Sequence, residues 1–398
     1  MTQFPYTDYE KIKEFSGKIG GNSIPFFSKP GLPDWTRITP ASSLLAEAVL
    51  PIWTDKLLII GCSHGALAAV LGRQVAENNL FVMESDQIAV NCTEMTLRAN
   101  GIQHFNIPSE ISLLPQAANS FELVALEIPK GRKITRHWLV ESFNLLKPGG
   151  SLYLAGANDQ GIQPIIKDAQ ALFGNAVIVG YKKGNRSALV RKEEIGTNLP
   201  EWAQEHGIAP GSWTCFQATL RHTKFEIFSL PGVFSYDRLD EGTSLLIDTL
   251  QIPSQSNILD VGCGYGIIGL YAASHTTTSR IDLVDVNRFA VAAATKNLCA
   301  NQAHNAQAFT SDLLDGVREK RYHLILSNPP FHTGKEVDYS VAYSLLRQAY
   351  RALEPQGQLI IVANQFIRYD YLMREVFKNA KILAKSNRFN VLSASKYD

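Results

Sequence analysis

The sequence predicts an α/β protein built from two tandem copies of one domain, of which the first is degenerate. Short apolar runs that indicate buried strands alternate with helical segments, which is typical of a mostly parallel sheet. The same order of segments recurs 201 residues later, as Arg37 and Arg238 or Phe121 and Tyr322 illustrate. A register kept over this length indicates an internal duplication. At 398 residues, the chain is long enough for two domains with full cores.

The first copy contains strands and helices in strict alternation after an irregular start. The first forty residues hold Gly20-Gly21 and several prolines, and we expect a loosely structured lead-in with one short helix. A polar, charged stretch at 182–198 precedes the domain boundary, so the sequence predicts domains at 1–205 and 206–398. The other elements expected in the first copy are a helix at 41–50 and strands at 56–60, 80–83, 121–126 and 151–155, with helices between them.

The second copy repeats these elements with a glycine-rich turn that is better preserved. We expect a strand at 257–261, a turn at 262–266 and a helix at 267–274. Further strands are expected at 281–284, before Ser311-Asp312, and at 322–326. After the last of these the register between the copies becomes 207, as Pro148 and Pro355 show, so the second copy carries six extra residues there.

The polar residue Asn328 follows an apolar run that is ended by two prolines. Neither proline can donate to a strand ladder, so Asn328 is expected at the carboxyl end of a central strand, where open α/β sheets bind ligands. The Asn328 side-chain oxygen and the Pro329 carbonyl are two acceptors for the two hydrogens of a planar amino group. Phe331 offers a ring for stacking, and His332 is a candidate substrate contact. The pattern favours methyl transfer to such a nitrogen, with Asn328, Pro329 and Phe331 as the catalytic residues.

The glycine-rich turn of the second copy follows an acid, Asp260, in the pattern Asp-x-Gly-x-Gly-x-Gly. A phosphate-binding loop rarely places a carboxylate there, whereas a cofactor with a sulfonium and an ammonium group tolerates it. Asp285 lies 19 residues past Gly266, where an acid can bind both ribose hydroxyls. Asp312 is placed to accept from an adenine amino group, and Asp240, in a loop at 232–242, is a candidate for an ammonium. The predicted cofactor-binding residues are Asp240, Asp260, Gly262, Gly264, Gly266, Asp285 and Asp312.

The first copy differs at the positions where chemistry is expected. Glu127 stands where the second copy has Asn328, and apolar or small residues replace several of the acids and glycines. We therefore expect a first domain that keeps the fold without catalysis. The replacements are Ile59 for Asp260, Ser63 for Gly264 and Ile111 for Asp312.

Composition excludes several classes of function. The net charge is +1, so any nucleic-acid binding must come from local patches. Five cysteines without a C-x-x-C pair and nine histidines without ligand spacing indicate a reducing compartment and no metal. No apolar run has the length of a membrane span, and the first ten residues do not resemble a signal peptide. We expect a soluble cytoplasmic protein, with a monomer favoured.

Together these motifs resemble class I S-adenosylmethionine-dependent methyltransferases. More specifically they resemble the ribosomal RNA guanine-N2 methyltransferases, both the C type that modifies small-subunit RNA and its G-type relative that modifies large-subunit RNA. The residues that carry the resemblance lie at 232–235, 239–242, 259–264, 327–332, 361–364 and 387–392.

The resemblance implies a fold, a cofactor and a substrate. The fold is two tandem Rossmann-like class I methyltransferase domains, and the cofactor is S-adenosyl-L-methionine. The substrate is a guanine in ribosomal RNA or in a ribosomal subunit, with a 16S-type target favoured. The resemblance also implies that the first domain helps folding and recognises RNA.

Other functions remain compatible with the sequence. Methyltransferases acting on DNA adenine or on protein glutamine also use Asn-Pro-Pro, usually followed by Tyr where this chain has Phe331. A non-catalytic RNA-binding scaffold with a vestigial cofactor site is a further alternative. Two basic runs of the first domain, at 130–136 and 182–192, are candidates for phosphate contacts.

Overall fold

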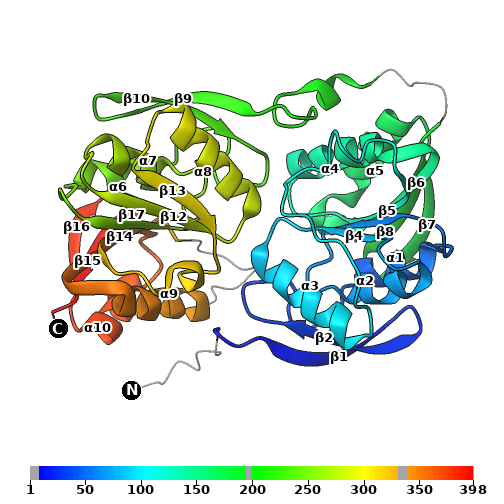
Figure 1. The fold of residues 1–398 in the computed structure, drawn as a ribbon, viewed down its shortest axis with the longest axis horizontal. Helices are drawn as coiled ribbons and strands as arrows, with labels where there is room; N and C mark the ends of the chain where they lie inside the picture. The colour runs from blue at the N-terminus through cyan, green and yellow to red at the C-terminus, as the bar shows by residue number, and fades with distance from the viewer. Residues whose placement is uncertain (1–8, 194–198, 330–338, 398) are drawn as a thin grey trace. The chain divides into compact units, whose positions relative to one another are not determined.

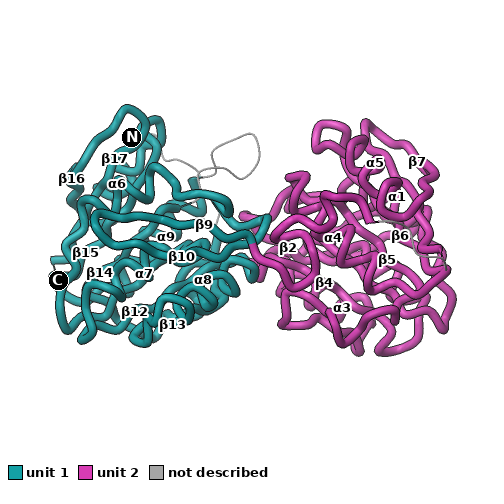
Figure 2. Tube along the Cα trace, turned by 90° about the horizontal axis from the view of Figure 1, so that it is seen from above, with its two compact units in different colours: residues 1–10, 214–398 teal, residues 11–213 magenta. Residues whose placement is uncertain are grey.

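The protein is described by a computed structural model that covers residues 9–193, 199–329 and 339–397. It divides into an N-terminal unit, Lys11–Trp213, and a C-terminal unit, Thr214–Asp398 with the segment Met1–Glu10 (Figure 2). The division falls eight residues after the predicted boundary at 205, because the segment after the boundary still packs on the N-terminal unit. His137 Nδ1 lies 3.0 Å from the Gly207 carbonyl oxygen, and Lys133 pairs with Glu205 at 2.9 Å.

Each unit begins with a β-hairpin. In the N-terminal unit, β1 (Lys13–Ile19) pairs antiparallel with β2 (Asn22–Ser28), and Gly20 and Gly21 both adopt positive φ in the turn. The expectation of a loosely structured lead-in is therefore wrong: glycines at a two-residue turn specify a hairpin. In the C-terminal unit, β9 (Thr214–Leu220) and β10 (Thr223–Ser229) form the same hairpin, 201 residues later.

The sheet of the N-terminal unit has the strand order β4-β3-β5-β6-β8-β7 among the described residues. The strands β4 to β6 are parallel, and β8 pairs antiparallel with both β6 and β7. The strand bounds are β3 Leu57–Ile60, β4 Leu80–Met83, β5 Phe121–Glu127, β6 Leu146–Ala157, β7 Val177–Lys182 and β8 Asn185–Arg191. The helix bounds are α1 Pro40–Ala48, α2 Ala66–Leu71, α3 Gln87–Ala99, α4 Arg132–Leu145 and α5 Ile162–Phe173.

The sheet of the C-terminal unit has the order β13-β12-β11-β14-β15-β17-β16. Helices α6, α7 and α8 lie on one face and α9 and α10 on the other (Figure 1). The strand bounds are β11 Asn257–Val261, β12 Arg280–Asp285, β13 Ala306–Thr310, β14 Tyr322–Ser327, β15 Leu353–Asn364, β16 Lys381–Lys385 and β17 Phe389–Ser395. The helix bounds are α6 Glu241–Thr249, α7 Ile267–Ser274, α8 Arg288–Ala300, α9 Tyr339–Ala352 and α10 Tyr369–Phe377.

The two sheets confirm the internal duplication. Apart from β13, each strand of the C-terminal sheet has a counterpart in the same order, and Phe81 makes only a single parallel bridge to Asn106 where β13 would pair. The polar, charged stretch at 182–198, which precedes the predicted boundary, contains β8, and this strand pairs with both β6 and β7. The sequence of β8, NRSALVR, does not alternate polar and apolar residues and lies within a run rich in charges, so it gives no clear strand pattern.

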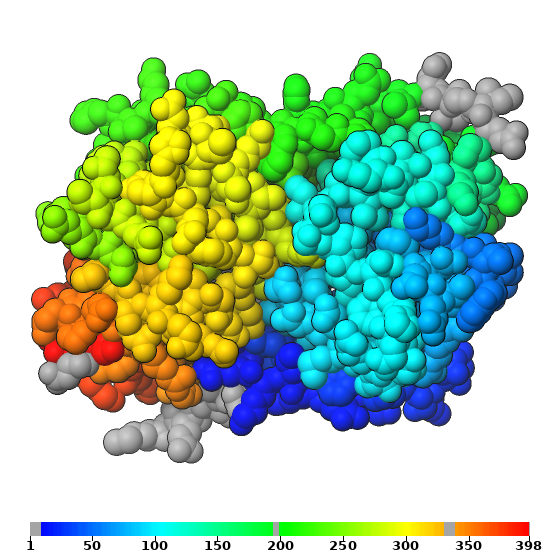
Figure 3. All heavy atoms as spheres, viewed as in Figure 1, coloured from blue at the N-terminus to red at the C-terminus, as the bar shows by residue number. Residues whose placement is uncertain are grey.

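The core of the C-terminal unit lies on both faces of its central strands. Residues of β11, β14 and β15 are almost fully buried between the two helical layers, for example Ile325 and Ile361 at 0% exposure. The segments around α8 and β13, coloured yellow, form much of the surface of this unit in the view of Figure 3. No described helix has the length and apolar character needed to cross a membrane.

Candidate active site

The polar residues predicted to act together gather at the carboxyl edge of the C-terminal sheet. Strands β11, β12 and β14 are parallel neighbours, with Val261 opposite both Val284 and Ser327. Asp285 ends β12, and Asn328 directly follows β14. The buried Ser327 hydroxyl donates to the Val261 carbonyl at 2.7 Å, which fixes the end of β14 against β11. The strand that carries Asn328 is therefore held rigidly up to the residue before it.

The Asn328 side chain has both amide hydrogens bound and its oxygen free. Its Nδ2 donates to Asp240 Oδ2 at 3.0 Å and to Thr243 Oγ1 at 2.8 Å. Its Oδ1 is buried and has no hydrogen-bond partner among the described residues. A buried acceptor without a partner costs about 1–3 kcal/mol, so this oxygen is poised to accept a hydrogen from a ligand.

The glycine turn between β11 and α7 is open on one side. A Cβ at Gly262 or at Gly264 would meet no atom within 4 Å, and both residues have positive φ. Gly266 is a different case, because a Cβ there would lie 2.9 Å from the Ala294 side chain. Gly262 and Gly264 thus leave room for a ligand over the turn, whereas Gly266 permits the packing of α7 against α8.

Asp285, a predicted cofactor-binding residue, is hydrogen-bonded to the glycine turn. Its Oδ2 accepts from the Gly264 N–H at 2.8 Å and its Oδ1 from the Asn287 N–H at 2.8 Å. Burial raises the pKa of this carboxyl, and the two N–H donors oppose that rise. Asp285 is thus bonded directly to the open glycine turn, and the strand that precedes this turn also pairs with the strand before Asn328.

Asp260 lies beneath the glycine turn, and its predicted contact with a cofactor stays a prediction. The side chain is 0% exposed, and Oδ2 accepts from the Gly269 N–H inside α7 at 2.9 Å. Burial and, to a smaller extent, the nearby Asp285 carboxylate raise the pKa of Asp260 to about 7, although the Gly269 N–H opposes this rise. Its position indicates that it fixes the start of α7 against β11, and so shapes the glycine turn indirectly.

The raised pKa of Asp260 predicts a pH-dependent stability. The pKa is near 4 in an unfolded chain and about 7 in the folded protein, so the folded state holds the proton more tightly. The contribution of this carboxyl to stability is therefore present at low pH, and it is lost as the pH rises from about 4 through about 7. Asp260→Asn keeps an oxygen for the Gly269 N–H but cannot ionise. We expect its melting temperature to exceed that of the parent chain by a margin that grows between about pH 5 and pH 8. Each kcal/mol of difference in stability corresponds to about 2–4 °C. Thermal melts over this range measure it, and a difference independent of pH would contradict it.

The loop at 232–242 is anchored to both sides of the glycine turn. The Asn287 Nδ2 donates to the Gly232 carbonyl at 2.9 Å, and the Tyr265 hydroxyl donates to the Arg238 carbonyl at 3.2 Å. At its end, Asp240 Oδ2 accepts from the Thr243 N–H at 2.8 Å and caps α6. Thr243 was missed by sequence reasoning, although the repeat register pairs it with another hydroxyl residue, Ser42.

Two further predicted residues lie at the margin of the site. Asp312 follows β13 by two residues, and the buried Tyr9 hydroxyl donates to its Oδ1 at 2.6 Å. No sequence signal connects Tyr9 with this position, because the two residues are 303 apart in the chain. Pro329 is described and buried, whereas Phe331 and His332 lie outside the described residues, so their predicted contacts stay predictions.

The corresponding edge of the N-terminal unit is closed. Glu127, in the position of Asn328, accepts from Thr39 Oγ1 at 2.7 Å and from Ser42 Oγ at 2.5 Å. Burial raises the pKa of Glu127. A Cβ at Gly61, the counterpart of Gly262, would lie 2.8 Å from the Glu127 carbonyl oxygen. The position that is open at Gly262 is therefore blocked by backbone at Gly61.

Most of the basic residues proposed for RNA contacts are engaged within the N-terminal unit. Arg132 and Arg136 both donate to the Asp168 carboxylate at 2.7–2.9 Å, and Lys192 donates to carbonyls at the end of α4. Lys130 and Lys183 are exposed. Other exposed basic residues, such as Lys133 and Arg191, have side-chain partners, so among the described residues of the two runs Lys130 and Lys183 stay the candidates for phosphate contacts.

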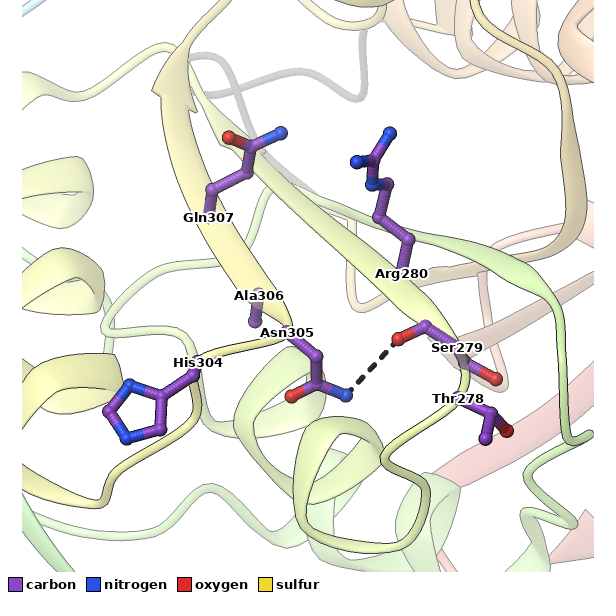
Figure 4. A pocket seen from close by; sticks show the side chains of 7 residues that line it. All are labelled: Thr278, Ser279, Arg280, His304, Asn305, Ala306 and Gln307. Atoms are coloured by element: carbon purple, nitrogen blue, oxygen red, sulfur yellow. Dashed lines mark hydrogen bonds between the residues drawn. The ribbon is translucent and has the colours of Figure 1, made fainter.

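A hollow of about 370 Å³ lies at the opposite edge of the C-terminal sheet. It is formed at the amino ends of β12 and β13, where Arg280 and Gln307 extend side by side and Asn305 donates to the Ser279 carbonyl (Figure 4). Since Asp285 and Asn328 lie at the carboxyl ends, this hollow is separate from the candidate site. No group of three His, Cys, Asp or Glu side chains among the described residues could hold a metal ion.

The sequences of both units match a known protein family. The sequence model of the methyltransferase small domain matches residues 23–185 and 224–393. A ribosomal RNA small subunit methyltransferase C from Psychromonas ingrahamii is 34% identical over 70% of this chain and 77% of that protein. One from Pseudomonas fluorescens is 31% identical over 90% of this chain and 99% of that protein.

A solved structure matches almost the whole chain. It is the T. thermophilus 16S rRNA N2 G1207 methyltransferase (RsmC), in complex with AdoMet and guanosine. The TM-score is 0.80 with 29% sequence identity, over 98% of this chain and 99% of that one. The duplicated fold is thus shared along the full length of both proteins.

Proposed function

Because the chain belongs to the methyltransferase small domain family, and within it to the ribosomal RNA small subunit methyltransferase C group, we propose that it methylates the exocyclic N2 amine of a guanine in 16S-type ribosomal RNA. S-adenosyl-L-methionine is the proposed methyl donor. The relative solved with AdoMet and guanosine, the cofactor and a nucleoside of the proposed substrate, supports this choice.

The observation that carries the proposal is the buried oxygen of Asn328, for which the described part of the chain offers no hydrogen-bond partner. A guanine N2 amine has a lone pair delocalised into the ring, so its two hydrogens must be held for the lone pair to face a methyl group. Asn328 Oδ1 accepts one hydrogen in this proposal, and the Pro329 carbonyl accepts the other. Since the bound amine needs orientation more than activation, most of the catalytic effect is positioning.

The residues around the glycine turn fit the proposed cofactor. Gly262 and Gly264 leave space over the turn, and Asp285 is the acid placed for two ribose hydroxyls. Asp312 is the acceptor proposed for the adenine amino group. When bound, S-adenosylmethionine supplies a methyl group activated by a sulfonium. No strong base is needed, because the amine nitrogen becomes acidic only after methylation and then releases its proton to water.

The N-terminal unit is proposed to support folding and RNA recognition. Its carboxyl edge is closed by Glu127, Thr39 and Ser42, so a second cofactor has no comparable space there. Exposed Lys130 and Lys183 are the side chains proposed to contact phosphates. The proposal also places the protein in the cytoplasm, as a monomer that acts on ribosomal RNA or on a subunit during its assembly.

Nucleoside analysis of ribosomal RNA tests the proposal in the cell. We expect 16S-type RNA from a deletion strain to lack one N2-methylguanosine, and a plasmid copy of the gene to restore it. A plasmid copy carrying Asn328→Ala should fail to restore it. Unchanged N2-methylguanosine in the deletion strain would contradict the proposal. Loss of N6-methyladenine or of methylglutamine instead would favour the DNA or protein methyltransferase alternatives.

A further inference from the structure

We propose that Asp240 and Thr243 are positioning residues that hold the Asn328 carboxamide so that its oxygen faces the substrate amine. This inference rests on the proposed function and adds two residues to it. The two Nδ2 hydrogens of Asn328 are taken by Asp240 Oδ2 at 3.0 Å and by Thr243 Oγ1 at 2.8 Å. A rotated carboxamide would present its oxygen to the Asp240 carboxylate, which has no hydrogen to donate, so the bond to Asp240 would be lost. The two acceptors therefore select one orientation, in which Oδ1 stays without a partner among the described residues.

The two acceptors, Asp240 and Thr243, both lie at the start of helix α6. Asp240 caps α6 by accepting from the Thr243 N–H at 2.8 Å, and Thr243 lies in the first turn of the same helix. Gly242 allows this part of the chain to pack closely, since a Cβ there would lie 3.1 Å from Asp240 Oδ2 and 3.2 Å from the Phe389 ring. The start of α6 thus packs between Phe389 and Asn328, and this packing fixes the positions of the Asp240 and Thr243 side chains.

The N-terminal unit contains the same hydrogen-bonded bridge between a strand end and a helix start, but with donor and acceptor groups exchanged. Thr39 caps α1 in the position of Asp240, Ser42 takes the place of Thr243, and Glu127 that of Asn328. There the hydroxyls donate to the carboxylate, at 2.7 and 2.5 Å, and one bond falls on each of its two oxygens. Both copies therefore tie the strand end to the helix start. Only the C-terminal copy places the acid on the helix and the amide on the strand, which leaves an acceptor for a ligand.

This arrangement gives Asp240 a role other than the one its sequence position suggests. The Oδ2 atom of Asp240 already accepts from two donors within the fold, the Thr243 N–H and the Asn328 amide. Through its bond to the Asn328 amide, Asp240 acts in this proposal on the substrate amine by way of Asn328. An ammonium ligand would act on the affinity for the cofactor, so the two roles predict changes in different measured quantities.

Two substitutions separate these roles. Asp240→Thr installs the helix cap that the N-terminal unit uses in Thr39, and its hydroxyl can donate to the Asn328 oxygen instead of accepting from the amide. Thr243→Val keeps the shape of the side chain and removes the acceptor. For both variants we expect kcat to fall by roughly tenfold or more, as for a misplaced reacting group. The dissociation constant for S-adenosylmethionine, measured by calorimetry, should stay within about twofold.

The conservative variant and the duplicated unit supply the controls. Thr243→Ser keeps the acceptor and should recover most of the rate that Thr243→Val loses. Ser42→Ala removes the equivalent hydroxyl from the N-terminal unit, and its kcat per folded molecule should match the parent chain, with circular dichroism giving the folded fraction.

Each other outcome overturns the inference. Weaker cofactor binding with an unchanged kcat at saturating cofactor would assign Asp240 to the ammonium. If kcat and cofactor affinity are unchanged in both variants, then the hydrogen bonds from Asn328 to Asp240 and Thr243 only connect α6 to the end of β14 and have no role in catalysis. A parent chain that forms no N2-methylguanosine at all contradicts the proposed function instead, so the two failures are distinguishable.

Discussion

Replacing Asn328 by alanine should abolish methyl transfer while cofactor binding stays nearly intact. The substitution removes the acceptor for the substrate amine, and loss of a positioning contact at the reacting atom should cost on the order of a hundredfold or more in rate. Asp240 keeps its bond to the Thr243 N–H, so the start of α6 and the adjoining loop should persist. Single-turnover rates with saturating RNA, beside calorimetric binding of S-adenosylmethionine, measure the two effects separately.

The matched control lies in the duplicated unit. Glu127 occupies the position of Asn328 in the N-terminal copy, and Glu127→Gln alters the equivalent side chain by one atom. We expect this variant to keep the parent rate per folded molecule. If Asn328→Ala turns over at nearly the parent rate, then Asn328 does not hold the amine, and the site has been placed wrongly.

Replacing Asp285 by alanine should remove detectable cofactor binding from the whole chain. The carboxylate is the acid proposed to bind two ribose hydroxyls, and it also holds the Gly264 N–H. Hydrogen bonds to a charged group are worth about 1.5–3 kcal/mol each, so affinity should fall on the order of a hundredfold or more. Calorimetry on the parent chain should give one site, because the N-terminal turn is closed by Glu127.

Glu84 supplies the comparison for this experiment. It follows β4 directly, at the position that corresponds to Asp285 at the end of β12, and its carboxylate accepts from the Ser63 N–H at 3.2 Å. Glu84→Ala should therefore leave one site of parent affinity. Two sites in the parent chain would show that the N-terminal unit also binds the cofactor, and binding that survives Asp285→Ala unchanged would remove Asp285 from the site.

The duplication and the central strands could be predicted from the sequence because they depend on local apolar patterns. The repeat register placed Asp285 and Asn328 at strand ends, and the structure puts both at the carboxyl edge of one sheet. The hairpin β9–β10 could not be predicted, since Arg221 and His222 give no turn signal and Arg221 adopts positive φ. Such a turn depends on tertiary contacts, here the Arg221 guanidinium, which donates to three carbonyls at the end of α6.

Side-chain roles within the site were less predictable than side-chain positions. An acid before a glycine turn has the same sequence pattern whether it faces a ligand or, as Asp260 does, the buried start of a helix. The partners of Asn328 come from a helix start 85–88 residues earlier in the chain, and Tyr9 is 303 residues from Asp312. Contacts over such separations depend on the folded topology and leave no local signal.

The most direct test of the account is the transfer of tritium from labelled S-adenosylmethionine to four substrates. These are unmethylated small ribosomal subunits, their naked RNA, DNA and a release-factor protein. An exocyclic amine inside an A-form helix cannot reach a buried methyl donor, so the guanine must be unpaired or flipped. We expect label in N2-methylguanosine from the ribosomal particles or their RNA, and none with Asn328→Ala. Label in N6-methyladenine or methylglutamine, with none in N2-methylguanosine, would contradict it.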